Sequence, residues 1–174
     1  MGCLYFVRHG ETVWNVENKI CGATDVELTE RGHQQAIETG QKIVAEGIRA
    51  DRILYSPLAN HIAEITGIPA QMEPRLKEQN FGKWEGTPRD GEEFKKAKED
   101  FCCRYDGGES MLQLAQRVYN LLDELRAESE STTYILVAHN GISRVIHSYF
   151  QDMTNQEYAA FGVPNCAILR YEFV

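Results

Sequence analysis

Short apolar runs mark the positions of the expected strands. The runs at 3–7, 52–55 and 134–138 consist mostly of apolar residues and end abruptly at polar ones. Such runs are typical of strands that are buried on both faces of a parallel sheet. A final strand is expected at 166–173. The spacing of these runs leaves room for a helix between successive strands, which predicts an α/β fold.

Between the strands, apolar residues recur at helical spacing. Thr29 is expected to cap a helix that ends at Gly47, and Ser110 with Gln113 forms a capping box for a long helix. Shorter helices are expected at 58–66, near 91–101, through Val145 and Ile146, and after a Thr154/Glu157 capping box. The predicted buried faces of the two long helices are Ala36, Ile37, Gly40, Ile43 and Val44, and Met111, Leu112, Ala115, Val118, Leu122 and Leu125. Together with the strands, these helices predict a three-layer αβα sandwich with a mostly parallel sheet.

Composition narrows the class of protein. The 174 residues are 43% hydrophobic and 25% charged, so we expect one globular domain spanning residues 1–174. No apolar run reaches the roughly 18 residues of a membrane span, and the N-terminus lacks the features of a signal peptide. The net charge of −8 argues against a nucleic-acid partner. The sequence does not indicate an oligomeric state.

The cysteines give no sign of a metal or redox site. There are five, and no CxxC spacing occurs among them. We interpret them as reduced thiols in a cytoplasmic protein, with neither a bound metal nor a cofactor.

Two of the expected strands end in polar clusters that contain histidine. Arg8-His9 follows the first strand, and His139-Asn140 follows the strand at 134–138. Ligands of open α/β sheets bind beyond the carboxyl ends of the strands, so both clusters are expected to face one crevice. The alternative is that each histidine is only a hydrogen-bonded residue at the end of a strand.

Several motifs, in order along the chain, resemble those of the histidine phosphatase superfamily, in its phosphoglycerate mutase-like branch. The motifs are Arg8-His9-Gly10-Glu11-Thr12 with Trp14-Asn15, Leu28-Thr29-Glu30-Arg31-Gly32, Tyr55-Ser56-Pro57-Leu58, Leu76-Lys77-Glu78 with Phe81-Gly82, Gly107-Gly108-Glu109-Ser110 and Val137-Ala138-His139-Asn140-Gly141. The resemblance covers nearly the whole chain. It implies a phosphoglycerate mutase-like fold and an enzyme that transfers a phosphoryl group.

The resemblance also implies the roles of individual residues. His9 would attack phosphorus to form a phosphohistidine, and Arg8 and His139 would bind the phosphoryl oxygens. Glu78 occupies the position of the family's proton donor. Further contacts to the substrate or to the phosphate are expected from Asn15, Cys21, Gly22 and Asn140.

The second motif departs from the family pattern. The family continues Ser-Pro-Leu-x-Arg-Ala, and its arginine is the second cation of the phosphate pocket, whereas Asn60 stands at that place here. About six residues are absent, so the helix would be shorter by almost two turns, or roughly 9 Å. Either the deletion is genuine and impairs the phosphate pocket, or a segment is missing from the chain as read between Ala59 and Asn60. We favour the second interpretation, because losing two turns of a core helix should be severely destabilising, and we predict a gap at this point.

The resulting prediction is a phosphatase that hydrolyses a small phosphorylated metabolite through phosphohistidine on His9. One alternative is a cofactor-dependent phosphoglycerate mutase, which uses the same residues. The stretch between Gly86 and Gly107 is too short for the insertions of the family's mutases, which favours the phosphatase. The other alternative is a non-catalytic phosphate-binding relative, which only the missing arginine supports. The sequence does not name the physiological substrate.

Overall fold

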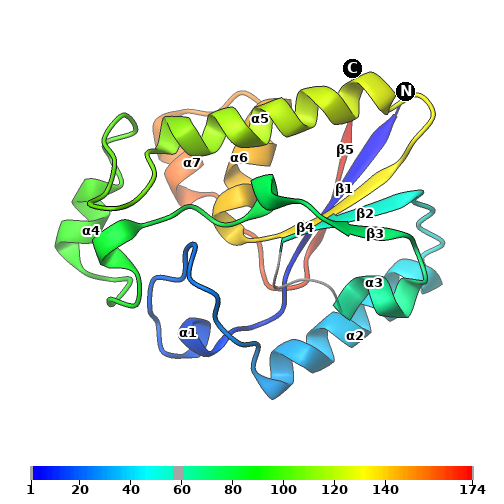
Figure 1. The fold of residues 1–174 in the computed structure, drawn as a ribbon, viewed down its shortest axis with the longest axis horizontal. Coiled ribbons are helices and arrows are strands. Elements are labelled where there is room, and N and C mark those ends of the chain that lie inside the picture. Colours follow the sequence, from blue (N-terminus) through cyan, green and yellow to red (C-terminus); the bar gives the residue numbers. More distant parts are fainter. Residues whose placement is uncertain (1, 57–60, 174) are drawn as a thin grey trace.

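A computed structural model describes residues 2–56 and 61–173. Its sheet has five strands in the order β3-β2-β4-β1-β5 (Figure 1). These strands are β1 (Cys3–Arg8), β2 (Arg52–Tyr55), β3 (Ala70–Met72), β4 (Tyr134–Ala138) and β5 (Ile168–Glu172). The strands β1, β2, β3 and β4 pair in parallel, and β5 pairs antiparallel with β1 at one edge. The sheet is therefore mostly parallel, as predicted.

Helices cover both faces of this sheet. In Figure 1, α2 (Glu30–Ala45) and α3 (His61–Thr66) lie on one side of it. On the other side lie α5 (Met111–Glu128) and α6 (Asn140–Phe150), with α7 (Asn155–Ala160) beside them. The protein is a three-layer αβα sandwich.

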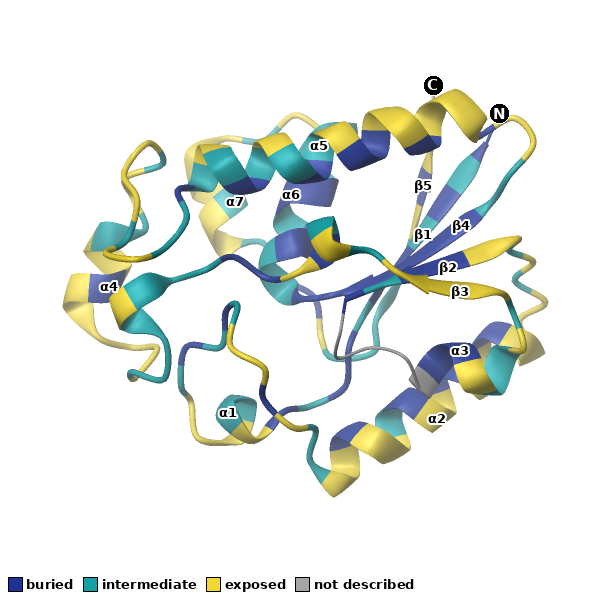
Figure 2. Cartoon of the chain, in the orientation of Figure 1, coloured by how far each residue is buried: buried dark blue, intermediate teal, exposed yellow. Residues whose placement is uncertain are grey.

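The sheet separates two groups of buried apolar side chains. One group joins Val7, Ile53 and Ile135 to α2 and α3. The other joins the opposite face of the same strands to α5 and α6. Every residue of β4 is buried, whereas the outer faces of α2 and α5 are exposed (Figure 2). An apolar strand with both faces covered is what the run at 134–138 predicts.

The predicted helix ends agree closely with the structure. Thr29 caps α2 by accepting a hydrogen bond from the backbone N–H of Gly32. The helix ends just before Gly47, which has a φ of 66°. Both capping boxes, Ser110/Gln113 on α5 and Thr154/Glu157 on α7, are present. These ends are readable from sequence because each depends on side chains only three residues apart.

The predicted buried faces were wrong at several positions. Val44 on α2 is 59% exposed and Leu112 on α5 is 55% exposed, whereas Leu114 and Leu121 are buried. An apolar residue at the margin of a helical stripe can lie on either side of it, and packing against the sheet decides which. The sequence also gave no sign of β3, whose three residues are all exposed.

The remaining elements lie beyond the carboxyl ends of the strands (Figure 1). They are the short helix α1 (Val13–Val16), the 3-10 helices η1 (Pro74–Leu76) and η2 (Gly82–Trp84), and α4 (Glu92–Ala97). The helix near 91–101 was predicted with bounds that are too wide. This part of the chain lies over the carboxyl ends of β1 and β4, which the two histidine clusters follow.

Two further expectations concern chain continuity and membranes. The gap expected between Ala59 and Asn60 falls outside the described residues and stays a prediction, as does the start of the helix expected at 58–66. Throughout the part of the chain that is described, no helix combines the length and apolarity needed to cross a bilayer.

Candidate active site

Strand register brings His9 and His139 together. In the parallel pair of β1 and β4, Arg8 lies opposite Ala138, so the next residue of each strand is a histidine. The backbone N–H of His9 donates to the carbonyl of Ala138 over 2.9 Å. The centroids of the two imidazole rings are 4.6 Å apart. The crevice expected from the strand ends is therefore present.

The hydrogen bond of His9 leaves its Nε2 free. Its Nδ1 lies 2.6 Å from the carbonyl oxygen of Gly10, which can only accept, so we assign the ring proton to Nδ1. Burial, together with nearby His139, lowers the pKa of His9 to about 3. At neutral pH the ring is uncharged, and Nε2 carries the free lone pair.

His139 is held in the same buried environment. Its Nε2 lies 2.6 Å from the hydroxyl oxygen of Ser56, which follows β2. Burial, together with the positive charges of Arg8 and Arg117, lowers the pKa of His139 to about 3. In the absence of an anion His139 is therefore neutral, and a bound phosphoryl dianion would favour its charged form.

Arg8 has a buried N–H group without a hydrogen-bond partner among the described residues. Its Nη1 donates to the carbonyl of Val163. Its Nε is buried and has no partner among the described residues. A buried N–H without an acceptor is costly, and an anion oxygen would satisfy it. Arg8 and His9 line the same cavity.

Glu78 is a buried carboxyl group held by two backbone N–H groups. Oε1 accepts from Gln79 over 2.9 Å, and Oε2 accepts from Gly141 at the start of α6 over 2.7 Å. Burial raises the pKa of Glu78, although both hydrogen bonds and the nearby Arg144 act in the opposite direction. A carboxyl group with a raised pKa can act as a general acid.

The segment that carries Glu78 is tied to α5. Arg117 donates to the backbone carbonyls of Arg75 and Glu78, at 2.5 and 3.2 Å. The same guanidinium forms two hydrogen bonds with Glu109, at 2.8 and 3.0 Å. These contacts fix the backbone from which the Glu78 side chain reaches the site.

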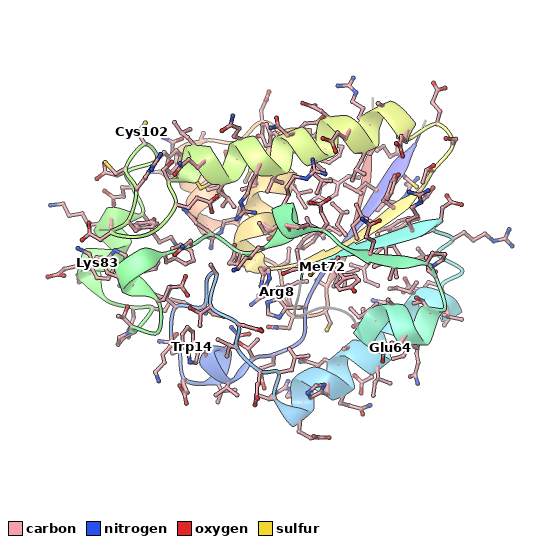
Figure 3. The ribbon with its side chains drawn as sticks, in the orientation of Figure 1. Arg8, Trp14, Glu64, Met72, Lys83 and Cys102 are labelled. Carbon is pink, nitrogen blue, oxygen red and sulfur yellow. The ribbon has the colours of Figure 1, made fainter. Side chains whose placement is uncertain are left out.

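Nearly all the residues expected at the site line one cavity of about 110 Å³. Those that line it are Arg8, His9, Asn15, Cys21, Glu78, His139 and Asn140. Gly22 does not line it, and its backbone N–H instead donates to Glu85 over 3.2 Å. Figure 3 shows Arg8 near the centre of the molecule, whereas Lys83 and Cys102 lie at the outer edge.

Two polar residues of the site have their oxygens already engaged. Asn15 Oδ1 accepts from the backbone N–H of Thr12, and Asn140 Oδ1 accepts from that of Val163. The amide NH₂ of each remains available as a donor to an anion. Cys21 is different, because burial and the nearby carboxylates raise the pKa of its thiol to about 11. It lines the cavity as a neutral group.

Sequence reasoning missed three cations of this cavity. Arg89 precedes α4, Lys98 follows it, and Arg144 lies on α6. Arg144 could have been found, since it lies four residues after Asn140 and so on the same face of the helix. Arg89 and Lys98 carried no such signal, because only the folding of the irregular segments around α4 brings them to the cavity.

The described residues contain no cluster of three or more His, Cys, Asp or Glu side chains arranged to hold a metal ion. All five cysteines are free.

Comparison with known proteins places the chain among phosphoryl-transfer enzymes. A protein from Erwinia tasmaniensis, named as a probable phosphoglycerate mutase, is 32% identical over 182 residues, covering 97% of this chain and 84% of the relative. That alignment is longer than the chain, so the relative has residues that this chain lacks.

Solved structures agree with this placement. A mycobacterial glucosyl-3-phosphoglycerate phosphatase, in complex with VO3, has a TM-score of 0.83 and 26% identity, covering 98% of this chain and 90% of that one. An open reading frame product from Mycobacterium tuberculosis has a TM-score of 0.84 and 25% identity, covering 99% and 92%. The sequence also matches the family profile of the histidine phosphatase superfamily (branch 1) over residues 4–174. The chain belongs to this superfamily.

Proposed function

We propose that the protein is a phosphatase that hydrolyses a small phosphomonoester through a phosphohistidine on His9. The observation that carries the proposal is the meeting of His9, His139, Arg8 and Glu78 around one small cavity. Its volume of about 110 Å³ is well below the roughly 300 to 1,000 Å³ of sites that hold whole small molecules, which suits a single phosphoryl group.

In the first step, Nε2 of His9 attacks phosphorus and the ester P–O bond breaks. Arg8 and His139 bind the equatorial oxygens, with the unpaired Nε of Arg8 as one donor. Arg89, Lys98 and Arg144 add positive charge around the same cavity. Positioning and neutralisation of charge are the main requirements of phosphoryl transfer.

Glu78 serves both halves of the reaction. Its carboxylic acid gives a proton to the departing alkoxide, which leaves as the alcohol. The resulting carboxylate then takes a proton from water as that water attacks the phosphohistidine. Inorganic phosphate leaves, and both His9 and Glu78 return to their starting states.

A second candidate is a phosphoglycerate mutase, favoured by the name of the relative from Erwinia tasmaniensis. The glucosyl-3-phosphoglycerate phosphatase neighbour and the short segment between Gly86 and Gly107 favour hydrolysis. The two reactions differ in the acceptor: water releases phosphate, whereas a mutase returns the phosphoryl group to a sugar acid. The third alternative, a phosphate binder without turnover, would leave the arrangement of Glu78 unused.

The test is to replace the nucleophile and measure both turnover and labelling. His9→Ala should abolish phosphate release from a panel of phosphorylated metabolites, and also acid-labile labelling of the protein by a ³²P-labelled substrate. His33→Ala, on the exposed side of α2, is the matched control and should retain both. Hydrolysis by His9→Ala near the wild-type rate would remove the nucleophile assignment. Isomerisation of 3-phosphoglycerate without phosphate release would identify a mutase instead.

A further inference from the structure

A second cavity adjoins the catalytic one and is much larger. It has a volume of about 540 Å³, within the range of roughly 300 to 1,000 Å³ that is usual for small-molecule sites. Six residues line both cavities: Phe81, Arg89, Phe94, Lys98, Gly141 and Arg144. A molecule whose phosphoryl group lies at His9 can therefore extend into the larger space.

Aromatic side chains form much of the wall of this second cavity. Phe81, Phe94 and Tyr105 make one group, with ring centroids 5.5 to 6.3 Å apart. Phe101 and Tyr158 make another, with centroids 5.7 Å apart. Phe94 is buried, and the other four rings are only half-buried. Ring faces left open to a cavity gain free energy when an apolar group covers them.

Five charged residues line the second cavity: Arg89, Lys95, Lys98, Glu99 and Arg144. Arg89, Lys98 and Arg144 lie at the junction with the catalytic cavity, where the phosphoryl group needs positive charge. Lys95 and Glu99 line the second cavity but not the catalytic one; both are exposed, and Lys95 is paired with Glu92 over 2.7 Å. The remaining lining is uncharged: the amides of Gln79, Asn155 and Gln156 are polar, whereas the aromatic rings, Met111 and Ala159 offer an apolar surface.

We propose that this aromatic cavity is the leaving-group site, and that it selects phosphomonoesters of alcohols bearing a planar aromatic group. The inference rests on the proposed phosphatase function and names its substrate class. The phosphoryl group lies at His9, and the ring lies among the side chains of Phe81, Phe94, Phe101 and Tyr158. A short polar alcohol, such as glycerate, leaves most of this volume unfilled.

The test compares esters that differ in the ring but not in the kind of leaving group. Ethyl, benzyl and 2-naphthylmethyl phosphate all release a primary alcohol, so each makes a similar demand on Glu78. We expect kcat/KM for 2-naphthylmethyl phosphate to exceed that for ethyl phosphate by about tenfold or more, with benzyl phosphate between them. Equal values for the three esters would overturn the inference and leave the phosphatase function intact.

A matched pair of variants on α7 tests whether the preference for the naphthyl ester arises in this cavity. Ala159 lines the cavity and Ala160 does not, although both residues are exposed. Ala159→Trp should reduce the ratio of the two kcat/KM values by about tenfold, whereas Ala160→Trp should keep it at the wild-type value. An unchanged ratio in a folded Ala159→Trp protein would overturn the assignment. The wild-type series decides the inference even if this variant fails to fold.

Binding of non-hydrolysable analogues separates the two proposals. Isothermal titration calorimetry with ethylphosphonate and 2-naphthylmethylphosphonate needs no turnover. If no ester is hydrolysed but the naphthyl analogue binds about tenfold more tightly, the proposed function fails and the aromatic site stands. If both analogues bind equally, the aromatic site is wrong whatever the catalytic result.

Discussion

Burial sets the protonation states of the groups on which the reaction depends. It lowers the pKa values of His9 and His139 to about 3 and raises that of Glu78. One cavity therefore holds a neutral imidazole, the proposed nucleophile, and a carboxyl group that keeps its proton to higher pH than an exposed one. The same physical cause thus prepares the nucleophile and the acid.

Glu78→Gln should slow esters of poor leaving groups most. An alkoxide needs the proton that Glu78 supplies, whereas a nitrophenolate leaves with less help, so the loss of kcat should be on the order of a hundredfold for ethyl phosphate. The loss should be much smaller for 4-nitrophenyl phosphate. Steady-state kinetics over a series of leaving groups measures this, and an equal loss across the series would contradict the role of Glu78 as acid.

The pH dependence of kcat/KM tests the same role of Glu78. The acid form of Glu78 is required, so kcat/KM for ethyl phosphate should fall as pH rises through the raised pKa of that group. In Glu78→Gln this fall should disappear from the remaining activity.

At the scale of elements, the first turn of α6 donates a backbone hydrogen bond to the carboxyl group of Glu78. The amide of Gly141 donates to Glu78, and a Cβ placed at Gly141 would lie 2.3 Å from Oε1 of the same carboxyl group. Gly141→Ala should leave α6 intact, because alanine favours a helix, but it should displace the carboxyl group. We expect a loss of kcat of roughly tenfold or more for ethyl phosphate. The loss for 4-nitrophenyl phosphate should be smaller.

Gly91→Ala is the matched control for this change. The nearest atom to a Cβ at Gly91 is the carbonyl oxygen of Pro88, at 3.5 Å, which is an ordinary contact. This variant should keep wild-type kinetics, and circular dichroism should give similar melting temperatures for both proteins. A Gly141→Ala enzyme with unchanged selectivity between the esters would show that Glu78 does not depend on this close approach.

Element by element, the sequence is most informative where the deciding interactions are local. The capping box at Ser110 and the apolar run of β4 involve neighbouring residues, so both were predictable. The meeting of His9 and His139 followed from strand ends and family motifs. Lys98 and the aromatic cavity depend on how the segment around α4 folds over the sheet, and no periodic pattern encodes that.

At the scale of the whole molecule, net charge and local charge have opposite signs. The chain carries −8, yet four cations, Arg8, Arg89, Lys98 and Arg144, line the catalytic cavity. The repulsion among them is visible at Lys98, whose pKa is lowered to about 8 by burial and then by Arg144 and Arg89. A bound phosphoryl group would relieve this repulsion, so an acidic protein can still hold an anionic substrate.

The buried histidines should also make the fold sensitive to acid. Their folded pKa values of about 3 lie below the ordinary histidine value of about 6.5, so the unfolded chain binds more protons between these values. Their contribution to stability is complete above about pH 6.5 and is lost as pH falls towards 3, by at most about 1.4 kcal/mol per pH unit for each histidine. Glu78, with its raised pKa, acts in the opposite sense.

Replacing one of the two histidines tests its contribution to the pH dependence of the free energy of unfolding. Urea unfolding of the wild type should give a free energy of unfolding that falls between pH 6.5 and pH 4, and His139→Asn should reduce the slope because asparagine takes up no proton. Gln41→Asn, on the exposed surface of α2, changes no titrating group, so it is the control and should keep the wild-type slope. Parallel curves for wild type and His139→Asn would mean that His139 binds a proton equally in the folded and unfolded chains. The neutral imidazole pair assigned to the empty site would then be wrong.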